Sequence, residues 1–260
     1  MNWCDNWTHW DHYTGKPDGN FDVDFGPVTF TTRETGPFRL EDFAGWFNGV
    51  NRGDDTSKTP NGHGQQRGTA YYGPRAVTVE GHVFTTPDRG VSTLWQTMQE
   101  LDAVKSGVIR VASHAVPFTE ADVTVASLRW TPITADVGTY TIVFTSDRPE
   151  IGSADPVTLS TGSAVTLRNE GNTDAGPVVE WVGSATNPGL TWSGGSWRLG
   201  QNVPSGGRLR VNFLTGHIWL NGQRILPPWT GTMPLIAPGK QLAVTAVGRS
   251  AVARRESAWI

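Results

Sequence analysis

The chain has 260 residues and a formal net charge of −3, with 37% hydrophobic and 17% charged residues. This length allows one large or two ordinary domains, and the mild acidity implies no general attraction to nucleic acid or anionic lipid. The single cysteine, Cys4, excludes an internal disulfide and a cysteine-rich zinc site.

The residue usage favours a β protein. The 31 glycines, 17 prolines and 12 tryptophans are typical of short strands joined by many turns, and the aromatic content argues against disorder. No apolar run approaches the ~20 residues of a membrane-spanning helix, and the start has no secretory pattern. We therefore expect a soluble protein made in a reducing cytosol.

Residues 1–20 predict an N-terminal aromatic arm. Trp3, Trp7 and Trp10 recur at helical spacing, but Gly and Pro follow at once and end the pattern. We expect this arm to pack on the body of the protein or on a neighbouring subunit. His9 and His12, with Cys4 and Asp5 nearby, match no closed zinc pattern, so no metal site is predicted.

Alternating residues predict strands before the central helix. Residues 21–32 read as one strand with a Gly-Pro break. Residues 38–51 are aromatic and end at Asn48-Gly49, a turn signal. Residues 53–68 read as a polar loop, and a loop of this length is usually functional or mobile. Residues 71–85 predict a strand pair, or one long strand with a bulge near Gly81.

One helix is predicted, from Thr86 to Gly107. Thr86 suits the N-cap and Gly107 the left-handed stop. Apolar residues at spacings of three and four form one stripe: Val91, Leu94, Trp95, Met98, Leu101 and Val104. This stripe requires a surface to pack on, so a sheet or barrel folded around one helix is expected.

The second half of the chain predicts more strands. Residues 147–156 are rich in Gly and Pro and mark a boundary between a domain of residues 21–150 and a domain of residues 151–260. From residue 157, strands recur every 8–12 residues, as in a sandwich or jelly roll. The fold class predicted is therefore mainly β, a barrel-like domain with one α-helix followed by a sandwich.

Tryptophans crowd the last third of the chain. Trp181 and Trp219 occupy apolar phases of their strands and are predicted to lie in the core between two sheets. Trp192, Trp197 and Trp229 lie near Gly and Pro, and their location stays open. Two short basic pairs, Arg208 with Arg210 and Arg254 with Arg255, suit salt bridges across an interface better than a nucleic-acid patch.

No residue is predicted to be catalytic, and no cofactor is implied. Asp22 and Asp24 fit a solvated strand face better than the paired carboxylates of sugar hydrolysis, and Asp54 with Asp55 fits ordinary loop composition. His63 lies between glycines, without a nucleophile elbow or an activated serine. No phosphate-binding glycine motif is present either.

Three stretches resemble the distal tail proteins of long-tailed, siphovirus-type bacteriophages, often called minor tail proteins. Residues 45–68 resemble the family's segment of Gly-Trp, Arg-Asp and His-Gly, and residues 77–101 its order of strand, glycine, strand and helix. Residues 176–222 resemble the C-terminal half, which ends in an Asn-Gly hairpin, and the closing residues 251–259 also fit. The resemblance spans the chain from about residue 21 onward, and its specificity lies in order and spacing.

The resemblance implies a ring-forming barrel with one helix, residues 21–150, and a galectin-like sandwich, residues 151–260. Such proteins form homo-hexameric rings at the tail tip or baseplate of the virion. The ring joins the tail tube protein to a tip or hub protein of the tail-associated lysin type, with other minor tail or receptor-binding proteins nearby. DNA passes through the lumen without specific binding, and assembly takes place in the host cytoplasm, with no membrane insertion.

A ring also needs one face of each subunit to meet a different face of the next. We expect these contacts at the aromatic arm and at residues 45–68; the residues concerned are Trp3, Trp7, Trp10, Trp46, Arg52, Asp54 and His63. Two alternatives stay open. A carbohydrate-binding module predicts exposed, coplanar tryptophans on a monomeric sandwich, and a glycosidase predicts two carboxylates facing each other across a cleft.

Overall fold

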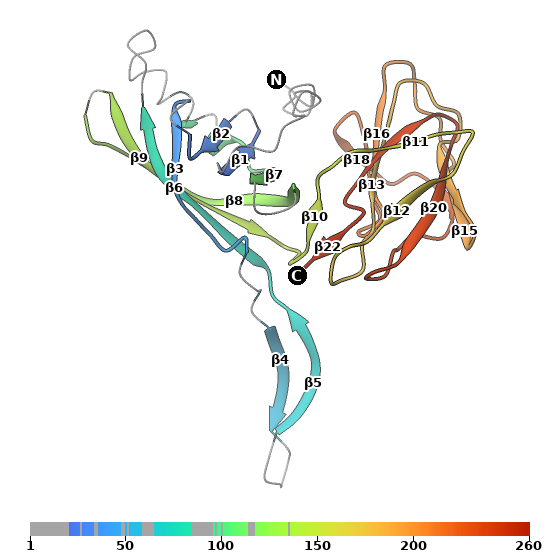
Figure 1. Cartoon of the computed structure of the whole chain (residues 1–260), viewed down its shortest axis with the longest axis horizontal. Helices are drawn as coiled ribbons and strands as arrows, with labels where there is room; N and C mark the ends of the chain where they lie inside the picture. The colour runs from blue at the N-terminus through green and yellow to red at the C-terminus, as the bar shows by residue number, and fades with distance from the viewer. Residues whose placement is uncertain are drawn as a thin grey trace. The chain divides into compact units, whose positions relative to one another are not determined.

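The computed structural model describes residues 21–260 except 27, 34–35, 48–49, 51, 59–64, 85–95, 97, 100, 114–117 and 135, and only the backbone of 21, 52–58, 65–71 and 113. The predictions for residues 1–20 and for His63 therefore lie outside the described residues. The described chain falls into two compact units (Figure 1). The first unit holds the described residues of 21–116 and 121–149. The second unit holds those of 117–120 and 150–260.

The first unit is a closed barrel. Hydrogen-bonded neighbours follow the order β8-β7-β1-β2-β3-β6-β9, and a further pairing of β9 with β8 completes the circle. Its strands are β1 (Phe21–Phe25), β2 (Val28–Thr31), β3 (Phe38–Ala44), β6 (Arg75–Phe84), β7 (Ser106–Ser113), β8 (Thr119–Pro132) and β9 (Val137–Ser146). Closure leaves none of the seven strands with a free edge along the barrel wall.

The barrel is filled by alternate residues of its strands, as the period of two requires. Strand β6 shows the alternation most clearly, with every second residue buried from Arg75 to Val83. Aromatic rings fill the interior: Phe25 contacts Phe144 at 4.8 Å between ring centroids, and Phe30 contacts Tyr140 at 5.2 Å. The mainly β, barrel-like domain predicted from the alternation is confirmed.

The bulge predicted near Gly81 is present, but the extra residue lies on the neighbouring strand. The register between β3 and β6 shifts between Leu40 and Asp42, opposite Gly81. A Cβ atom on Gly81 would lie 1.8 Å from the carbonyl oxygen of Arg39, so only glycine fits this close approach. The Tyr140 hydroxyl donates a hydrogen bond to the same carbonyl at 2.9 Å.

Two predictions for the first strands are wrong in detail. Residues 21–32 form a hairpin rather than one strand, because Gly26 takes a positive φ of 60° and the chain reverses there. Residues 53–68, predicted as a loop, contribute to two antiparallel strands, β4 (Arg52–Lys58) and β5 (Gln65–Tyr72). We call this two-stranded hairpin the arm, as distinct from the N-terminal aromatic arm predicted for residues 1–20. In the described chain its strands pair only with each other.

The predicted helix ends earlier than expected. Its described helical residues are Gln96, Met98, Gln99 and 101–103, and Met98 and Leu101 are buried as the apolar stripe requires. Gly107, predicted as the helix stop, belongs instead to β7. A Cβ atom there would lie 2.9 Å from the Phe25 ring, so this glycine serves close packing.

The second unit is a sandwich of two antiparallel sheets, which confirms the predicted β-sandwich. The six-stranded sheet has the order β11-β21-β13-β16-β17-β18, and the five-stranded sheet has the order β12-β20-β14-β15-β19. The strands are β11 (Val157–Leu159), β12 (Val165–Arg168), β13 (Val178–Val182), β14 (Gly189–Trp192), β15 (Gly195–Leu199), β16 (Arg208–Asn212), β17 (His217–Leu220), β18 (Gln223–Ile225), β19 (Trp229–Gly231), β20 (Gln241–Val247) and β21 (Ala251–Arg254).

Two further strands belong with this unit, β10 (Ile151–Ser153) and β22 (Ala258–Trp259). Strand β10 pairs with the first residues of β8 on one side and with β22 on the other. An ion pair supports this pairing. The Arg255 side chain lies 2.8 Å from the Glu120 carboxylate, which is buried. The ion-pair partner of Arg255 thus lies in the same chain, and a salt bridge of the pair Arg254-Arg255 across an interface stays a prediction.

The Asn-Gly hairpin is confirmed. Asn221 and Gly222 join β17 to β18, and both take positive φ values, 52° and 78°. This is the backbone of a type I′ turn, for which Asn-Gly is the preferred pair.

The sandwich core is built around two tryptophans. Trp181 from one sheet and Trp197 from the other are fully buried, with their ring centroids 6.3 Å apart, and Phe213 packs edge-on against Trp197 at 5.1 Å. The prediction for Trp181 is confirmed, and the open question about Trp197 is settled as core. Trp219 is half-buried and lies on the outer face of β17, so its predicted place in the core is wrong.

Removal of the Trp197 ring tests this packing. Trp197→Ala is expected to lower the free energy of unfolding by about 3–5 kcal/mol, because a large cavity forms between the sheets. Urea unfolding followed by circular dichroism measures the change. Trp229→Ala, at a ring that is 41% exposed, is the matched control and should cost far less. Equal losses in the two variants would contradict the assignment of Trp197 to the core.

Candidate functional site

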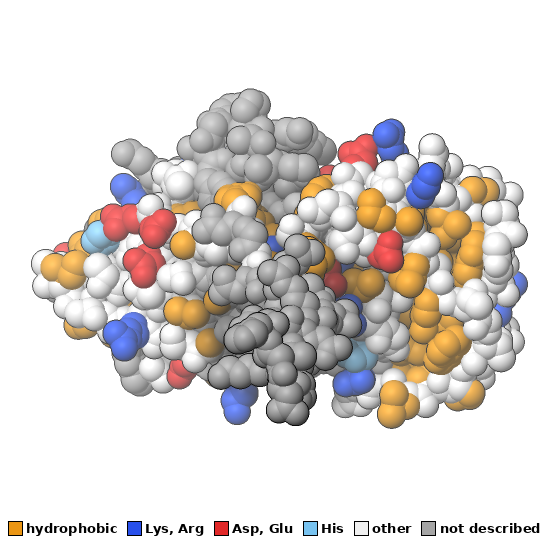
Figure 2. Space-filling view, turned by 90° about the horizontal axis from the view of Figure 1, so that it is seen from below, with side chains coloured by type: hydrophobic (Ala, Val, Ile, Leu, Met, Phe, Trp, Pro, Cys, Tyr) orange, Lys and Arg blue, Asp and Glu red, His pale blue; other side chains and the backbone are white. Residues whose placement is uncertain are grey.

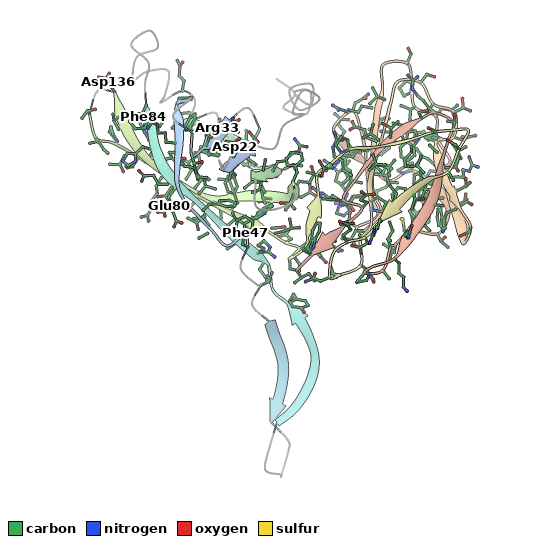
Figure 3. The ribbon with its side chains drawn as sticks, in the orientation of Figure 1. Asp22, Arg33, Phe47, Glu80, Phe84 and Asp136 are labelled. Atoms are coloured by element: carbon green, nitrogen blue, oxygen red, sulfur yellow. The ribbon has the colours of Figure 1, made fainter. Side chains whose placement is uncertain are left out.

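The surface where the arm joins the barrel carries exposed aromatic side chains. Phe47 follows β3 on the way into the arm, and Tyr72 is the last residue of β5 on the way out; they are 54% and 43% exposed. Figure 3 shows Phe47 at the place where the arm leaves the barrel, far from Asp136 at the other end of the barrel wall. Large exposed aromatics are enriched where proteins meet partners.

A buried arginine fixes both ends of the arm. Arg75, the first residue of β6, is 4% exposed and donates hydrogen bonds to three backbone carbonyls. Its Nη1 donates to Gly45 at 2.9 Å and to Trp46 at 2.8 Å, and its Nε donates to Pro149 at 2.9 Å. One guanidinium therefore ties the segment entering the arm, the segment leaving it and the end of the barrel unit.

Gly45 makes this arrangement possible. Its φ of 86° lies in the left-handed region, and a Cβ atom would lie 2.0 Å from the carbonyl oxygen of Ala76. The Gly-Trp pair singled out in the sequence thus has a backbone role at the base of the arm.

The predicted interface residues are placed unevenly. Trp46 is buried in its own subunit and packs near Phe43 at 6.0 Å between centroids, so Phe47 is the side chain that faces outward here. Arg52 and Asp54 lie on β4 of the arm, where only the backbone is described. An intersubunit role for these residues, and for Trp3, Trp7, Trp10 and His63, stays a prediction.

Asp22 and Asp24 are buried, so their assignment to a solvated strand face is wrong. Both point from β1 to the side opposite the buried Val23 and Phe25, yet each carboxylate has only 6% of its residue surface exposed. Thr31 on β2 donates a hydrogen bond to Asp22. Arg33 forms an ion pair with Asp22 at 3.2 Å, and both side chains are labelled in Figure 3.

The surroundings of the Asp24 carboxyl group favour its protonated form and so raise its pKa. Burial raises its pKa from 3.8 to about 7, and the charge of Asp22 acts in the same direction. A hydrogen bond from Thr29 and the charge of Arg110 oppose the rise but do not cancel it. The second oxygen, Oδ2, is buried without a hydrogen-bond partner among the described residues, so no donor there stabilises the ionised form.

The basic pair on β16 is engaged within the chain. Arg208 forms an ion pair with Glu180 on β13, and a salt bridge of this basic pair across an interface stays a prediction. Arg210 lies over the Trp219 ring, with its Cζ 5.4 Å from the ring centroid.

Within the described part of the chain, no group of three or more His, Cys, Asp or Glu side chains is placed to hold a metal ion. Among the same residues, no helix has the length and apolarity needed to cross a membrane.

Sequence reasoning missed the two residues that organise the arm base. Arg75 follows Gly-Pro and opens a strand, so it read as an ordinary charged residue. The signal that could have identified it is the alternation of β6. Arg75 lies two residues before Val77 and four before Val79, which are buried, so its side chain faces inward as theirs do. Phe47 was hidden in an aromatic run whose inner and outer members the sequence does not separate.

Replacing Arg75 tests the clamp. Arg75→Met leaves three carbonyls without their donor, and we expect the free energy of unfolding to fall by roughly 3–5 kcal/mol. Arg129→Met, an exposed arginine on β8, should change it by less than about 0.5 kcal/mol. Thermal unfolding of the two variants in parallel gives the comparison, and a wild-type melting temperature in Arg75→Met would refute the clamp.

The buried carboxyl group predicts a pH dependence. Because the folded-state pKa of Asp24 lies above its unfolded value, its contribution to stability is full below about pH 4 and is lost as the pH rises to about 7. Asp24→Asn removes this loss, so at pH 8 the variant should be more stable than the wild type by on the order of 2–4 kcal/mol. The difference should shrink toward pH 4.

Melting curves at pH 4, 5, 6, 7 and 8 measure this difference, and the exposed Asp136→Asn is the control for the loss of one carboxylate. A constant offset between Asp24→Asn and the wild type at all five pH values would contradict the raised pKa.

Comparison by sequence identifies no relatives: no protein-family model matches the chain, and no curated protein matches it. Comparison by structure finds chains of phage hub and baseplate assemblies. A chain of the phage P2 baseplate in its activated conformation with Ca matches with a TM-score of 0.51 at 9% identity, over 91% of this chain and 97% of that one.

Two further matches have TM-scores of 0.49. One is the SPP1 Dit (gp 19.1) protein, described as a paradigm of the hub adsorption apparatus in phages that infect Gram-positive bacteria, at 13% identity over 92% of this chain and 99% of that one. The other is the phage p2 baseplate in its activated conformation with Sr, at 9% identity over 91% and 97%. At these identities the likeness concerns the fold, and the match at 0.51 carries it. The resemblance of the sequence to distal tail proteins is thus accompanied by a fold found in a phage baseplate, over nearly the full length of both chains.

Proposed function

We propose that this protein is a structural component of a phage tail tip, a distal tail protein whose copies form a hexameric ring. The ring joins the tail tube to the tip or baseplate hub and leaves a lumen through which DNA passes. The protein works by geometry and interface burial, without catalysis. Its partners are further copies of itself, a tail tube protein and a hub protein.

The fold shared with a phage P2 baseplate chain carries this proposal. The match covers both compact units of this chain and nearly all of the other. The two chains therefore share the order of both units, and not a single common β domain. Fold does not fix function by itself, so the proposal also rests on the family resemblance of residues 45–68 and 176–222.

The geometry of the barrel supports assembly through its outer surface. Because the seven strands close on themselves, copies of the barrel have no wall edge through which to continue a sheet. Contacts between the barrels of neighbouring copies would therefore use outer side chains or the arm. The exposed pair Phe47 and Tyr72, set on the fixed base of the arm, is the best-defined candidate for such a contact.

The arm itself fits an interface role. An isolated two-stranded hairpin is marginally stable in water, and β4 with β5 has no third strand in the described chain. The arm sequences RGDDTSK and QQRGTAYY are largely polar, so a neighbouring copy would meet them through hydrogen bonds and ion pairs. A head-to-tail contact of this kind generates a closed ring when the rotation fits.

The alternative functions are less well supported by the described residues. For the hydrolase, Asp22 and Asp24 are buried on the side of β1 that faces away from the barrel interior, and threonines of β2 donate hydrogen bonds to them. For a carbohydrate-binding module built on coplanar exposed tryptophans, two of the five sandwich tryptophans, Trp181 and Trp197, form the core. A saccharide site of a different kind is argued below.

Mass in solution tests the ring. Light scattering of the full chain at rising concentration should show a species of six times the 28.2 kDa chain mass, visible as rings by electron microscopy. The double variant Phe47→Ser with Tyr72→Ser should weaken assembly by at least about tenfold in concentration, because it removes two large interface aromatics.

Ile133→Ser is the matched control, since Ile133 is 57% exposed next to the β8–β9 turn, away from the arm. A chain that stays monomeric at high concentration, and is absent from purified phage particles, would overturn the proposed function. Hexamers that resist the double variant but not the control would move the interface from the arm base to the other end of the barrel.

A further inference from the structure

Four neighbouring strands of the sandwich place a row of cationic and aromatic side chains on the outer face of the six-stranded sheet. Cross-strand register sets Glu180 opposite Arg210, Arg210 opposite Trp219, and Trp219 opposite Arg224. Their chain neighbours, among them Trp181, Leu209, Val211 and Ile218, point into the core. With a side-chain period of two, the row faces outward. We call Arg210, Trp219 and Arg224 the Arg-Trp-Arg row.

The charge of this face is positive, although the whole chain is acidic. Strands β13, β16, β17 and β18 carry three arginines and one histidine against a single acid, Glu180. Arg208 forms an ion pair with Glu180 and neutralises it. Arg224 is exposed, and no ion pair to it is found within the described residues.

The aromatic member of the row is held in a fixed orientation. Trp219 is half-buried, the Arg210 guanidinium lies over its ring, and His217 meets it edge-on with 5.6 Å between centroids. The Asn221-Gly222 turn sets β18 beside β17 and so makes Arg224 the cross-strand neighbour of Trp219 on the side away from β16. The row is thus set by register and turn geometry rather than by a mobile loop.

From this arrangement we infer a binding site for an acidic saccharide. An indole offers an apolar face on which the C–H face of a sugar ring can lie, and guanidinium groups bind carboxylate or phosphate oxygens in a bidentate manner. Adjacent strands are about 4.8 Å apart, so Arg210 and Arg224 stand roughly 10 Å apart at the backbone. This span suits one or two sugar rings that carry an anionic group.

A nucleic acid is the less suitable occupant. Binding of a phosphate backbone relies on a basic stripe that follows many phosphates, and here the cationic face is short on a chain of net charge −3. Figure 2 shows one face of the molecule, where basic side chains are scattered rather than gathered into a stripe. The inference concerns the sandwich alone and goes beyond the proposed ring, so either can fail without the other.

Calorimetric titration of the full chain tests the site. The probes are tetragalacturonate for the carboxylate, glucose 1-phosphate for the phosphate, neutral maltotetraose, and a ten-residue thymidine oligonucleotide. Tetragalacturonate, glucose 1-phosphate or both should bind more tightly than maltotetraose, and raised salt should weaken the binding. Which of the two binds identifies the source of the anionic group.

Two variants separate the site from the fold. Arg224→Gln, at an exposed position, should lower the affinity for the anionic sugar about tenfold while the melting temperature stays unchanged. Trp219→Leu should lower it by a similar or larger factor. Arg198→Gln, on β15 of the other sheet, is the matched control and should bind as the wild type does.

Three results would overturn the inference. They are no heat with either anionic sugar, equal affinity for maltotetraose and the anionic sugars, and an affinity that Arg224→Gln leaves at the wild-type value. Tighter binding of the oligonucleotide than of either sugar, lost in Arg224→Gln, would likewise replace the saccharide with a nucleic acid.

Discussion

The hydrogen bonds between β8 and β9 are the constraint on which the barrel depends. Without this pairing the remaining strands form an open curved sheet with two bare edges, and with it every barrel strand has two neighbours. Strand β8 can serve this role because it is long: at Thr119–Pro132 it pairs with β10 at Thr119 and Glu120, and with β9 from Thr124 to Pro132. Closure also fixes the interior, where Phe25, Phe30 and Tyr140 fill the space that the strands enclose.

The arm is stabilised differently from the barrel and the sandwich. The barrel and the sandwich each bury an apolar core of their own, whereas the arm has two strands and, in the described part of the chain, no third strand beside them. What holds the arm in place is a polar device at its base, the Arg75 guanidinium and three carbonyls. A buried charge of this kind is costly to leave unpaired, so it specifies one arrangement of the surrounding backbone.

The strands were predictable from the sequence, while the places where they meet were less so. Three features follow from local patterns and are present in the structure: the alternation in β6 and β9, the Asn-Gly turn, and the glycine at the β3 bulge. The pairing of β4 with β5 was missed because polar strands without an apolar face look like loop in sequence. The helix end was misjudged because Gly107 was assigned to capping, while tertiary packing against Phe25 required it in a strand.

The candidate sites show the same division. Trp219 has the apolar spacing of a core residue, and only cross-strand register reveals that it faces outward between two arginines. Asp22 and Asp24 occupy the solvent phase of β1, and the cover that buries them comes from contacts that no local pattern encodes. Trp46 and Phe47 are adjacent aromatics with opposite environments, a distinction made by the left-handed Gly45 that precedes them.

The arm is an excursion between two strands that are already neighbours. Strand β3 pairs with β6 along most of its length, so the barrel wall is continuous whether the chain between them is short or long. Length can therefore be gained or lost here during evolution at little thermodynamic cost to the wall, since loop entropy grows only slowly with the number of residues. The reach of the hairpin can therefore change while the barrel wall around its base keeps the same pairing.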